Sequence, residues 1–218
     1  HVGVGSTFDH LNGSFEMYGV HVPTGGCGDV GVGGFIQGGG FGFTSRMFGM
    51  MLDRMVSGRV MLWDGRIVEA SRDKNPDLFW AVRGGTGNNF GVLLQVTLKL
   101  VYMPEMWGFV LTWDRDDAPR ALEKMQASYM KDSPYGSIGY MSALTTNADH
   151  EPIVLMAGIC TEGREKGMEA IQELRDVGNP KLIFDQTESY PQLDPVLLNS
   201  LPGVPTPADV TYEIKDCG

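Results

Sequence analysis

A cysteine, Cys27, lies near the start of a stretch that is very rich in glycine, residues 25–42, in which ten of the eighteen residues are glycine. A thiolate is a nucleophile, and backbone N–H groups of a glycine-rich loop stabilise negative charge beside it, so this thiol could bond to an electron-poor partner. Glycine also lets the backbone turn sharply and approach a flat or anionic ligand closely. The alternative is a glycine-rich surface loop with a buried cysteine that packs as a small hydrophobe.

The same stretch contains a second pattern, Gly26-x-Gly28-x-x-Gly31, which matches the dinucleotide fingerprint of nicotinamide-dependent dehydrogenases. That fingerprint requires a helix after its last glycine, and we expect residues 32–34 (Val-Gly-Gly) to begin a helix poorly. Successive backbone N–H groups of a glycine-rich turn can bind phosphates without a lysine, which suits an acidic chain. We therefore interpret the match as a consequence of glycine content and keep a nicotinamide-dependent enzyme as a minor alternative.

Hydrophobic patterns predict the elements that hold this stretch in place. Asp64-Gly65 is a two-residue hairpin signal between two apolar runs. Asp77 is expected to cap a short helix in which Phe79 and Trp80 belong to the core. The elements expected in order are a strand (2–6), a helix that begins near residue 7, a hairpin (55–63 and 66–71), a short helix (78–83) and a half-buried strand (92–100).

The pattern breaks at Tyr102-Met103-Pro104, where we place a domain boundary between residues 1–102 and 103–218. The order strand, helix, strand, strand, helix, strand then predicts an antiparallel sheet with helices on one face, and an α+β fold overall. We expect a loop over 190–207 and a further strand over 209–215. The expected elements are strands at 106–113, 137–144, 152–160 and 181–185, with helices at 117–131 and 162–177.

Several short motifs follow one another in a fixed order along the first hundred residues. They are Val22-Pro23-x-Gly25-x-Cys27, Val30-Gly31-Val32-Gly33-Gly34, Gly38-Gly39-Gly40, Gly49, Asp53, Asp64-Gly65, Asp77-Leu78-Phe79-Trp80-Ala81 and Gly84-Gly85-x-Gly87-x-x-Phe90-Gly91-Val92. In this order and spacing the series resembles the second part of the FAD-binding domain of the vanillyl-alcohol-oxidase (PCMH-type) superfamily, and within it the berberine-bridge-enzyme-like and oligosaccharide-oxidase branch. The resemblance is strong over residues 1–101 and looser over 102–218.

This resemblance implies an FAD cofactor, and it implies that Cys27 bonds covalently to the flavin ring through sulfur. It places Ile67 and Val68 near the adenine side, although both also fit the core of a strand. The other residues that the resemblance places along the cofactor are Gly26, Gly31, Gly33, Gly34, Gln37, Gly39 and Phe41.

The implied activity is that of an FAD-dependent oxidase, which transfers hydride from a carbinol, sugar or amine carbon to flavin N5 with dioxygen as electron acceptor. The implied partners are a small-molecule substrate, dioxygen and an upstream segment of the same enzyme, because the resemblance begins within a domain. The catalytic residues are unknown, since Tyr212 and Glu213 match no motif, and Tyr140 and Cys160 lie on predicted strands whose orientation is open. A non-catalytic flavin-fold binding module remains an alternative.

Composition limits the other function classes. The chain has 17 Lys and Arg against 27 Asp and Glu, a net charge of −10, which argues against nucleic acid and anionic membrane surfaces as partners. Three cysteines are too few and too far apart for a disulfide framework or a zinc site, so no metal is expected. The first eight residues read as a strand rather than a signal peptide, and no apolar run suits a transmembrane helix. The compartment, secreted or cytoplasmic, stays open.

Overall fold

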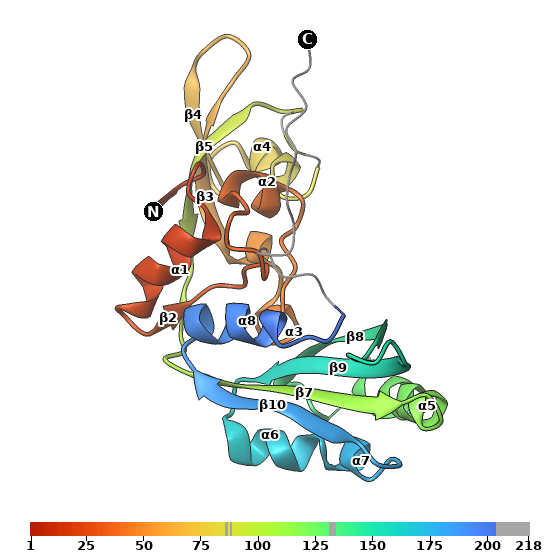
Figure 1. Ribbon diagram of the computed structural model, residues 1–218. Helices are drawn as coiled ribbons and strands as arrows, with labels where there is room; N and C mark the ends of the chain where they lie inside the picture. The colour runs from red at the N-terminus through yellow and green to blue at the C-terminus, as the bar shows by residue number, and fades with distance from the viewer. Residues whose placement is uncertain (86, 88, 131–133, 204–218) are drawn as a thin grey trace, which may run out of the picture.

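The computed structural model describes residues 1–85, 87, 89–130 and 134–203. Two four-stranded sheets and a two-stranded ribbon organise this part of the chain, and every strand pair within it is antiparallel. The first sheet is built from residues before 102 and the second from residues after 105 (Figure 1). The expected strand at 209–215, with Tyr212 and Glu213, lies outside the described residues.

The first sheet has the order β1-β5-β3-β4 and is covered on one side by α1 and α4, around one core. The predicted hairpin is present, but its turn takes in Trp63 as well as the expected Asp64-Gly65, since Gly65 N–H donates to the Leu62 carbonyl at 3.0 Å. Gly65 has φ +83°, the left-handed conformation that favours glycine. The bounds are β1 (Val2–Gly3), α1 (Phe8–Glu16), β3 (Met55–Met61), β4 (Ile67–Ser71), α4 (Pro76–Ala81) and β5 (Val92–Leu98).

Helix α4 differs from expectation in two respects. It begins at Pro76 after Asn75, which has φ +47°, rather than being capped by Asp77. Phe79 is buried as expected, but Trp80 is 77% exposed, so its assignment to the core is wrong. Phe79 shares the core with Val82, whereas Trp80 points about 100° away from Phe79 around the helix and faces solvent.

The glycine-rich stretch folds into a short helix, α2 (Val32–Gln37), so the expectation that residues 32–34 would not begin a helix is wrong. Val32 and Ile36 are fully buried one helical turn apart, and this burial outweighs the low helix propensity of the glycines. Gly33 packs so closely on Val4 that an added Cβ would lie 3.0 Å from the Val4 Cβ. The elements that follow are α3 (Ser45–Phe48) and the 3₁₀ turn η1 (Met51–Arg54), and β2 (Val20–His21) pairs with β6 (Val101–Tyr102).

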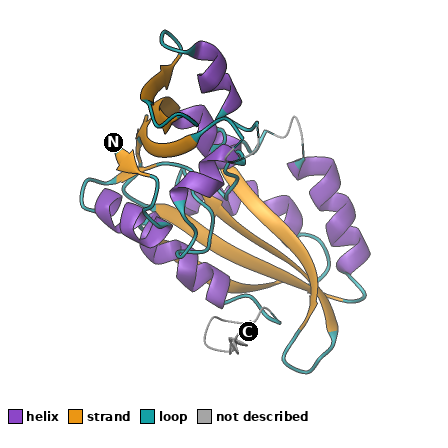
Figure 2. Ribbon diagram, turned by 90° about the horizontal axis from the view of Figure 1, so that it is seen from above, coloured by secondary structure: helices purple, strands orange, loops and turns teal. Residues whose placement is uncertain are grey.

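The second sheet has the order β10-β7-β9-β8 and runs close to the predicted strand positions. Helices α5, α6 and α7 cover one face as expected, and the predicted helix over 162–177 divides at the buried Ile171. Figure 2 shows the long strands of this sheet side by side. The bounds are β7 (Met106–Asp114), α5 (Ala118–Tyr129), β8 (Ile138–Thr146), β9 (Pro152–Cys160), α6 (Arg164–Ala170), α7 (Gln172–Arg175) and β10 (Lys181–Glu188).

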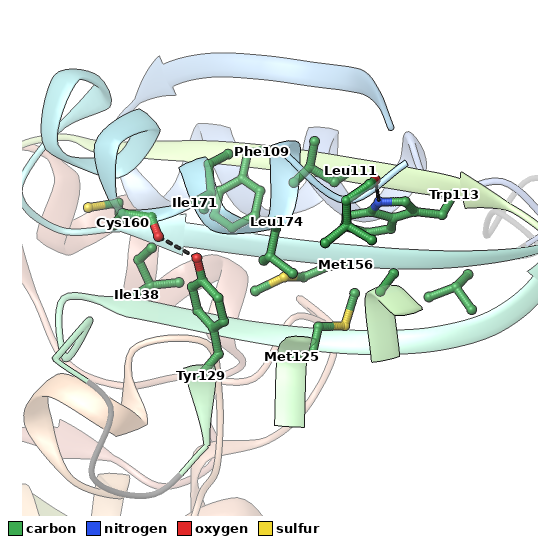
Figure 3. Close-up of a cluster of buried hydrophobic side chains, with 14 of the residues drawn as sticks. Phe109, Leu111, Trp113, Met125, Tyr129, Ile138, Met156, Cys160, Ile171 and Leu174 are labelled. Carbon is green, nitrogen blue, oxygen red and sulfur yellow. Dashed lines mark hydrogen bonds between the residues drawn. The ribbon is translucent and has the colours of Figure 1, made fainter. Parts of the chain in front are cut away.

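A buried cluster fills the space between the second sheet and α5–α7 (Figure 3). It takes alternate residues of β7, among them Phe109, Leu111 and Trp113, while the residues between them face a second cluster on the opposite side of the sheet. Two aromatic side chains of this cluster form hydrogen bonds through their polar atoms (Figure 3). Trp113 Nε1 donates to the Val177 carbonyl at 3.1 Å, and the Tyr129 hydroxyl donates to a backbone carbonyl of α6. The central strands β7 and β9 are therefore buried on both faces.

The opposite face is covered by α8 (Tyr190–Asn199), which lies between the second sheet and the first part of the chain (Figure 1). The expectation of a loop at 190–207 is wrong over the helix. Tyr190, Leu193 and Leu197 are buried at helical spacing, each contributing about 1.5–3 kcal/mol, which outweighs the roughly 3 kcal/mol that Pro195 costs inside a helix. No helix in the described part of the chain is long and apolar enough to cross a membrane.

Candidate functional site

A cavity of about 980 Å³ opens where the glycine-rich stretch meets the second sheet. One wall comes from the Cys27 loop and from residues 41–53, and the other comes from the end of α5 and the edge strand β8. The two walls touch at Gly139, where an added Cβ would lie 1.6 Å from the Phe43 carbonyl oxygen. The lining residues are mostly glycine, aromatic or methionine, which suits a flat, largely apolar ligand.

The thiol of Cys27 lies on this wall and is exposed, so the alternative of a buried cysteine is wrong. The loop that carries it is fixed against the start of α1, because Phe8 N–H donates to the Val30 carbonyl at 3.1 Å and Asp9 N–H to the Gly28 carbonyl at 3.0 Å. A Cβ at Gly28 would lie 1.9 Å from the Asp9 carboxylate, so a larger residue there would require the Asp9 side chain to move. An accessible thiol on a rigid loop can react with a ligand that fills the cavity.

Of the residues that the sequence places along the cofactor, Gly26 and Phe41 join Cys27 at the cavity. Phe41 is 70% exposed, which leaves its ring free to contact a ligand. The others lie elsewhere in the glycine-rich stretch: Gly31 and Gly34 are on the surface, and Gly33, Gln37 and Gly39 are buried. The Gln37 side-chain amide donates to the Gly33 carbonyl at 3.0 Å, and Gly39 has φ +111°, so these buried positions shape the stretch from within.

Ile67 and Val68 line a separate pocket of about 300 Å³ on the surface of the first sheet. His1, Arg59 and Gln95 contribute to the same pocket, and none of these residues borders the larger cavity. The structure therefore does not bring Ile67 and Val68 together with Cys27.

Arg46, which sequence reasoning missed, links the two walls of the cavity. Its terminal nitrogens donate to the Tyr129 carbonyl at 2.6 Å and to the Met130 carbonyl at 2.9 Å, at the end of α5. A positive charge at this end of a helix also complements the helix dipole. The partners are 83 and 84 residues away, so no local pattern in the sequence marks the contact.

The structure answers the open question about two residues of the second sheet. Tyr140 lines the cavity, and its hydroxyl donates to the Met130 sulfur at 3.6 Å. Burial raises the pKa of Tyr140, and the nearby Arg46 lowers it by less, so the hydroxyl stays protonated at neutral pH. Cys160 is fully buried in the core between the sheet and the helices, away from the cavity.

A buried polar layer supports the Cys27 loop from behind. The Tyr190 hydroxyl donates to the Thr24 carbonyl at 3.3 Å, and the ring of Tyr190 lies 4.5 Å from that of His21. Burial, followed by the charge of Arg54, lowers the pKa of His21 to about 3, so it is neutral. Burial raises the pKa of Asp194 to about 7, and its Oδ1 has no hydrogen-bond partner.

The closeness of Asp194 to Gly26 connects this layer to the cavity wall, because a Cβ at Gly26 would lie 3.5 Å from both carboxylate oxygens. It would also lie 2.5 Å from Leu198 on the same helix. Within the described residues, no group of three or more His, Cys, Asp and Glu is arranged to hold a metal ion. The site is therefore an apolar cavity with one accessible thiol and a few charged groups around it.

Comparison with known proteins shows which proteins this chain is similar to. Residues 1–71 match a family described as an FAD binding domain. Berberine bridge enzyme-like 23 from Arabidopsis thaliana is 43% identical over 48% of this chain and 20% of its own length. The FAD-linked oxidoreductase pytB from Aspergillus terreus is 31% identical over 84% of this chain and 22% of its own length.

Solved structures agree with the sequence relatives. The carbohydrate oxidase from Microdochium nivale has a TM-score of 0.74 and 27% identity, covering 91% of this chain and 42% of its own. This chain spans between about a fifth and a third of the length of the curated relatives it matches, from 20% to 35%. The expected fold class is confirmed. Residues 1–71 therefore carry part of an FAD-binding domain, and the chain is similar to berberine-bridge-enzyme-like proteins and carbohydrate oxidases.

Proposed function

We propose that the protein is an FAD-dependent oxidoreductase that acts as an oxidase on a small molecule with a carbinol, sugar or amine carbon. The observation that carries the proposal is the accessible Cys27 thiol on the wall of a largely apolar cavity, in a chain whose residues 1–71 match an FAD-binding domain. Bound FAD would accept a hydride from the substrate carbon at N5 and pass the electrons to dioxygen, giving hydrogen peroxide.

The residues of the cavity fit this cofactor. Gly26 and Phe41 offer a close backbone and an exposed ring for a flat ligand, and Cys27 would supply the sulfur of a thioether bond to it. Formation of that bond removes two hydrogens, one from the thiol and one from the ring, and dioxygen takes them up as hydrogen peroxide. The buried glycines of α2 and its flanks, with Gln37, hold the stretch in shape, and Ile67 and Val68 are proposed for the adenine side.

The proposed partners are the substrate, dioxygen and an upstream segment of the same protein. We propose that residues 1–102 form the FAD-binding part and that the second sheet with its helices forms the substrate-binding part. Antiparallel pairing throughout the described strands gives no support to a nicotinamide-binding fold, which uses parallel strands. The glycines and the exposed thiol favour a working site over a non-catalytic binding module.

The test is the intact mass of the full-length protein after denaturation, compared with Cys27→Ser. We expect the wild type to carry the mass of one FAD on the peptide that contains Cys27, and we expect Cys27→Ser to lack a bond at this position. Cys160→Ser is the matched control, because Cys160 is buried away from the cavity and should keep the adduct. Bound FAD without an adduct at Cys27 would remove the covalent role, and a colourless, bare protein would contradict the flavoprotein assignment.

A further inference from the structure

The two walls of the cavity differ in what they offer a ligand. The Cys27 loop and Phe41 form the wall that we assign to the cofactor. The opposite wall, here called the β8–α5 wall, is formed by Tyr129, Met130, Tyr140 and Met141. If the cofactor lies on the first wall, the substrate must lie on the β8–α5 wall, so the chemistry of that wall determines which substrate fits.

Most polar side chains around the cavity are already satisfied within the protein. Ser45 Oγ accepts a hydrogen bond from a backbone N–H at 2.9 Å, and both terminal nitrogens of Arg46 donate to backbone carbonyls. Asp53 accepts from a backbone N–H at 2.9 Å, and the Tyr129 hydroxyl donates to a backbone carbonyl. A ligand with many hydroxyl groups would therefore find few partners among the described lining residues. Each buried hydroxyl without a partner weakens binding about tenfold.

Tyr140 is the exception, because its hydroxyl donates to a thioether sulfur at 3.6 Å, and thioethers are weak acceptors. An oxygen of a ligand is a stronger acceptor and can replace the sulfur. The burial that raises the pKa of Tyr140 keeps this hydroxyl a donor at neutral pH. Among its described side chains, the β8–α5 wall therefore offers a ligand one hydrogen-bond donor, the Tyr140 hydroxyl.

The rest of the β8–α5 wall is apolar and partly uncovered. Met130 is 57% exposed and Met141 is 41% exposed, and both border the cavity. Tyr129 itself is 1% exposed, so its ring supports the Tyr140 ring from the core, edge to face, with centroids 6.3 Å apart and an angle of 88° between the planes. Thioether sulfurs and ring edges make favourable contacts with aromatic rings.

We infer that the part of the substrate lying on the β8–α5 wall is an aromatic ring with one hydrogen-bonding oxygen, rather than a sugar ring with several hydroxyls. This inference rests on the proposed function for its placement of the cofactor. Tyr140 is the specificity residue in this inference, because its hydroxyl is the hydrogen-bond donor for the substrate oxygen and the residues around it are apolar.

The experiment measures binding of three probes to the full-length, flavin-loaded protein by calorimetry. Acetophenone has an aromatic ring and one acceptor oxygen but no carbinol to oxidise, α-methylstyrene lacks the oxygen, and methyl glucoside is a sugar ring. We expect acetophenone to bind about 100-fold more tightly than methyl glucoside and about tenfold more tightly than α-methylstyrene. Equal or tighter binding of the glucoside would overturn the inference.

The variant Tyr140→Phe should reduce acetophenone binding to the level of α-methylstyrene and leave α-methylstyrene binding unchanged. Tyr18→Phe is the matched control, because Tyr18 is 72% exposed and lies outside the cavity. A Tyr140→Phe variant that binds acetophenone as well as the wild type would overturn the role of Tyr140. A protein that cannot be loaded with FAD would contradict the proposed function, whereas a flavin-loaded protein that prefers the glucoside would contradict this inference alone.

Discussion

The two sheets of this chain bury their strands to very different extents. In the second sheet, β7 and β9 are buried along almost their whole length, with one cluster toward α5–α7 and another toward α8. In the first sheet, β3, β4 and β5 alternate between buried and exposed residues around a single cluster. The central strands β7 and β9 of the second sheet are packed on both faces, while β3 and β5 in the middle of the first sheet have a core on one face only.

This difference in burial indicates that the second sheet contributes more to stability than the first. Val56, Ile67 and Val92 of the first sheet are each between 46% and 51% exposed, and Trp63 and Trp80 nearby are more exposed still. The second sheet is the rigid support, and the cavity forms where its edge strand β8 meets the glycine-rich stretch of the other part.

Truncation of one apolar side chain in each sheet should show the largest contrast. Leu111→Ala in β7 removes a side chain that is 1% exposed, and we expect it to lower the free energy of unfolding by about 2–5 kcal/mol. Ile67→Ala in β4 removes a side chain that is 50% exposed and should cost less than about 1 kcal/mol. Urea denaturation measures both, and similar losses would contradict the contrast between the sheets.

The helix between the two parts should respond to pH through Asp194. Its pKa is raised from 3.8 to about 7, so its contribution to stability is present below pH 4 and is lost as the pH rises through about 7. Relative to the wild type, Asp194→Asn should become more stable by about 4 kcal/mol between pH 4 and pH 8, because the pKa is raised by about three units at about 1.4 kcal/mol each.

His21 has the opposite dependence, since its lowered pKa gives a contribution that is present above pH 6.5 and lost as the pH falls toward 3. Both proteins contain His21, so the difference between them isolates Asp194. The control is Asp29→Asn, because Asp29 is exposed. Parallel stability curves for Asp194→Asn and the wild type between pH 4 and pH 8 would show that Asp194 ionises freely.

The contact between the parts at Gly139 gives a third test. Gly139→Ala places a Cβ against the Phe43 carbonyl and should lower stability by about 1–3 kcal/mol, the usual cost of overpacking. Gly136→Ala, in the same wall, meets no heavy atom within 4 Å and should change stability little. Thermal unfolding measures both variants. Equal melting temperatures would mean that the two parts separate at no cost.

The smallest effect is expected at Arg46, which joins the parts through two hydrogen bonds to the end of α5. Arg46→Gln should lower stability by about 1 kcal/mol, because the site is exposed to solvent. Arg72→Gln removes another exposed arginine, in the turn after β4, and serves as the control. A loss of stability at Arg72 as large as that at Arg46 would assign the effect to charge alone.

The sequence predicted those elements whose signal is local. Asp64-Gly65 indicated the hairpin, and the alternation of residues 92–100 indicated a strand, because side chains of a strand alternate between its faces. It failed where distant contacts decide the outcome. Helix α8 contains Pro195 and α2 contains glycine, yet both form, because each buries apolar side chains against segments far away in the sequence.

The sequence by itself determined the hairpin and the long strands of both sheets, the glycine-rich stretch, the resemblance to an FAD-binding domain and Cys27 as the candidate thiol. Only the tertiary structure decided that Cys27 is exposed, that Tyr140 faces the same cavity and that Arg46 joins its walls. The physical reason is separation along the chain. Local backbone preferences are encoded in neighbouring residues, whereas a cavity between Cys27 and Tyr140 exists only after the two parts of the chain have packed together.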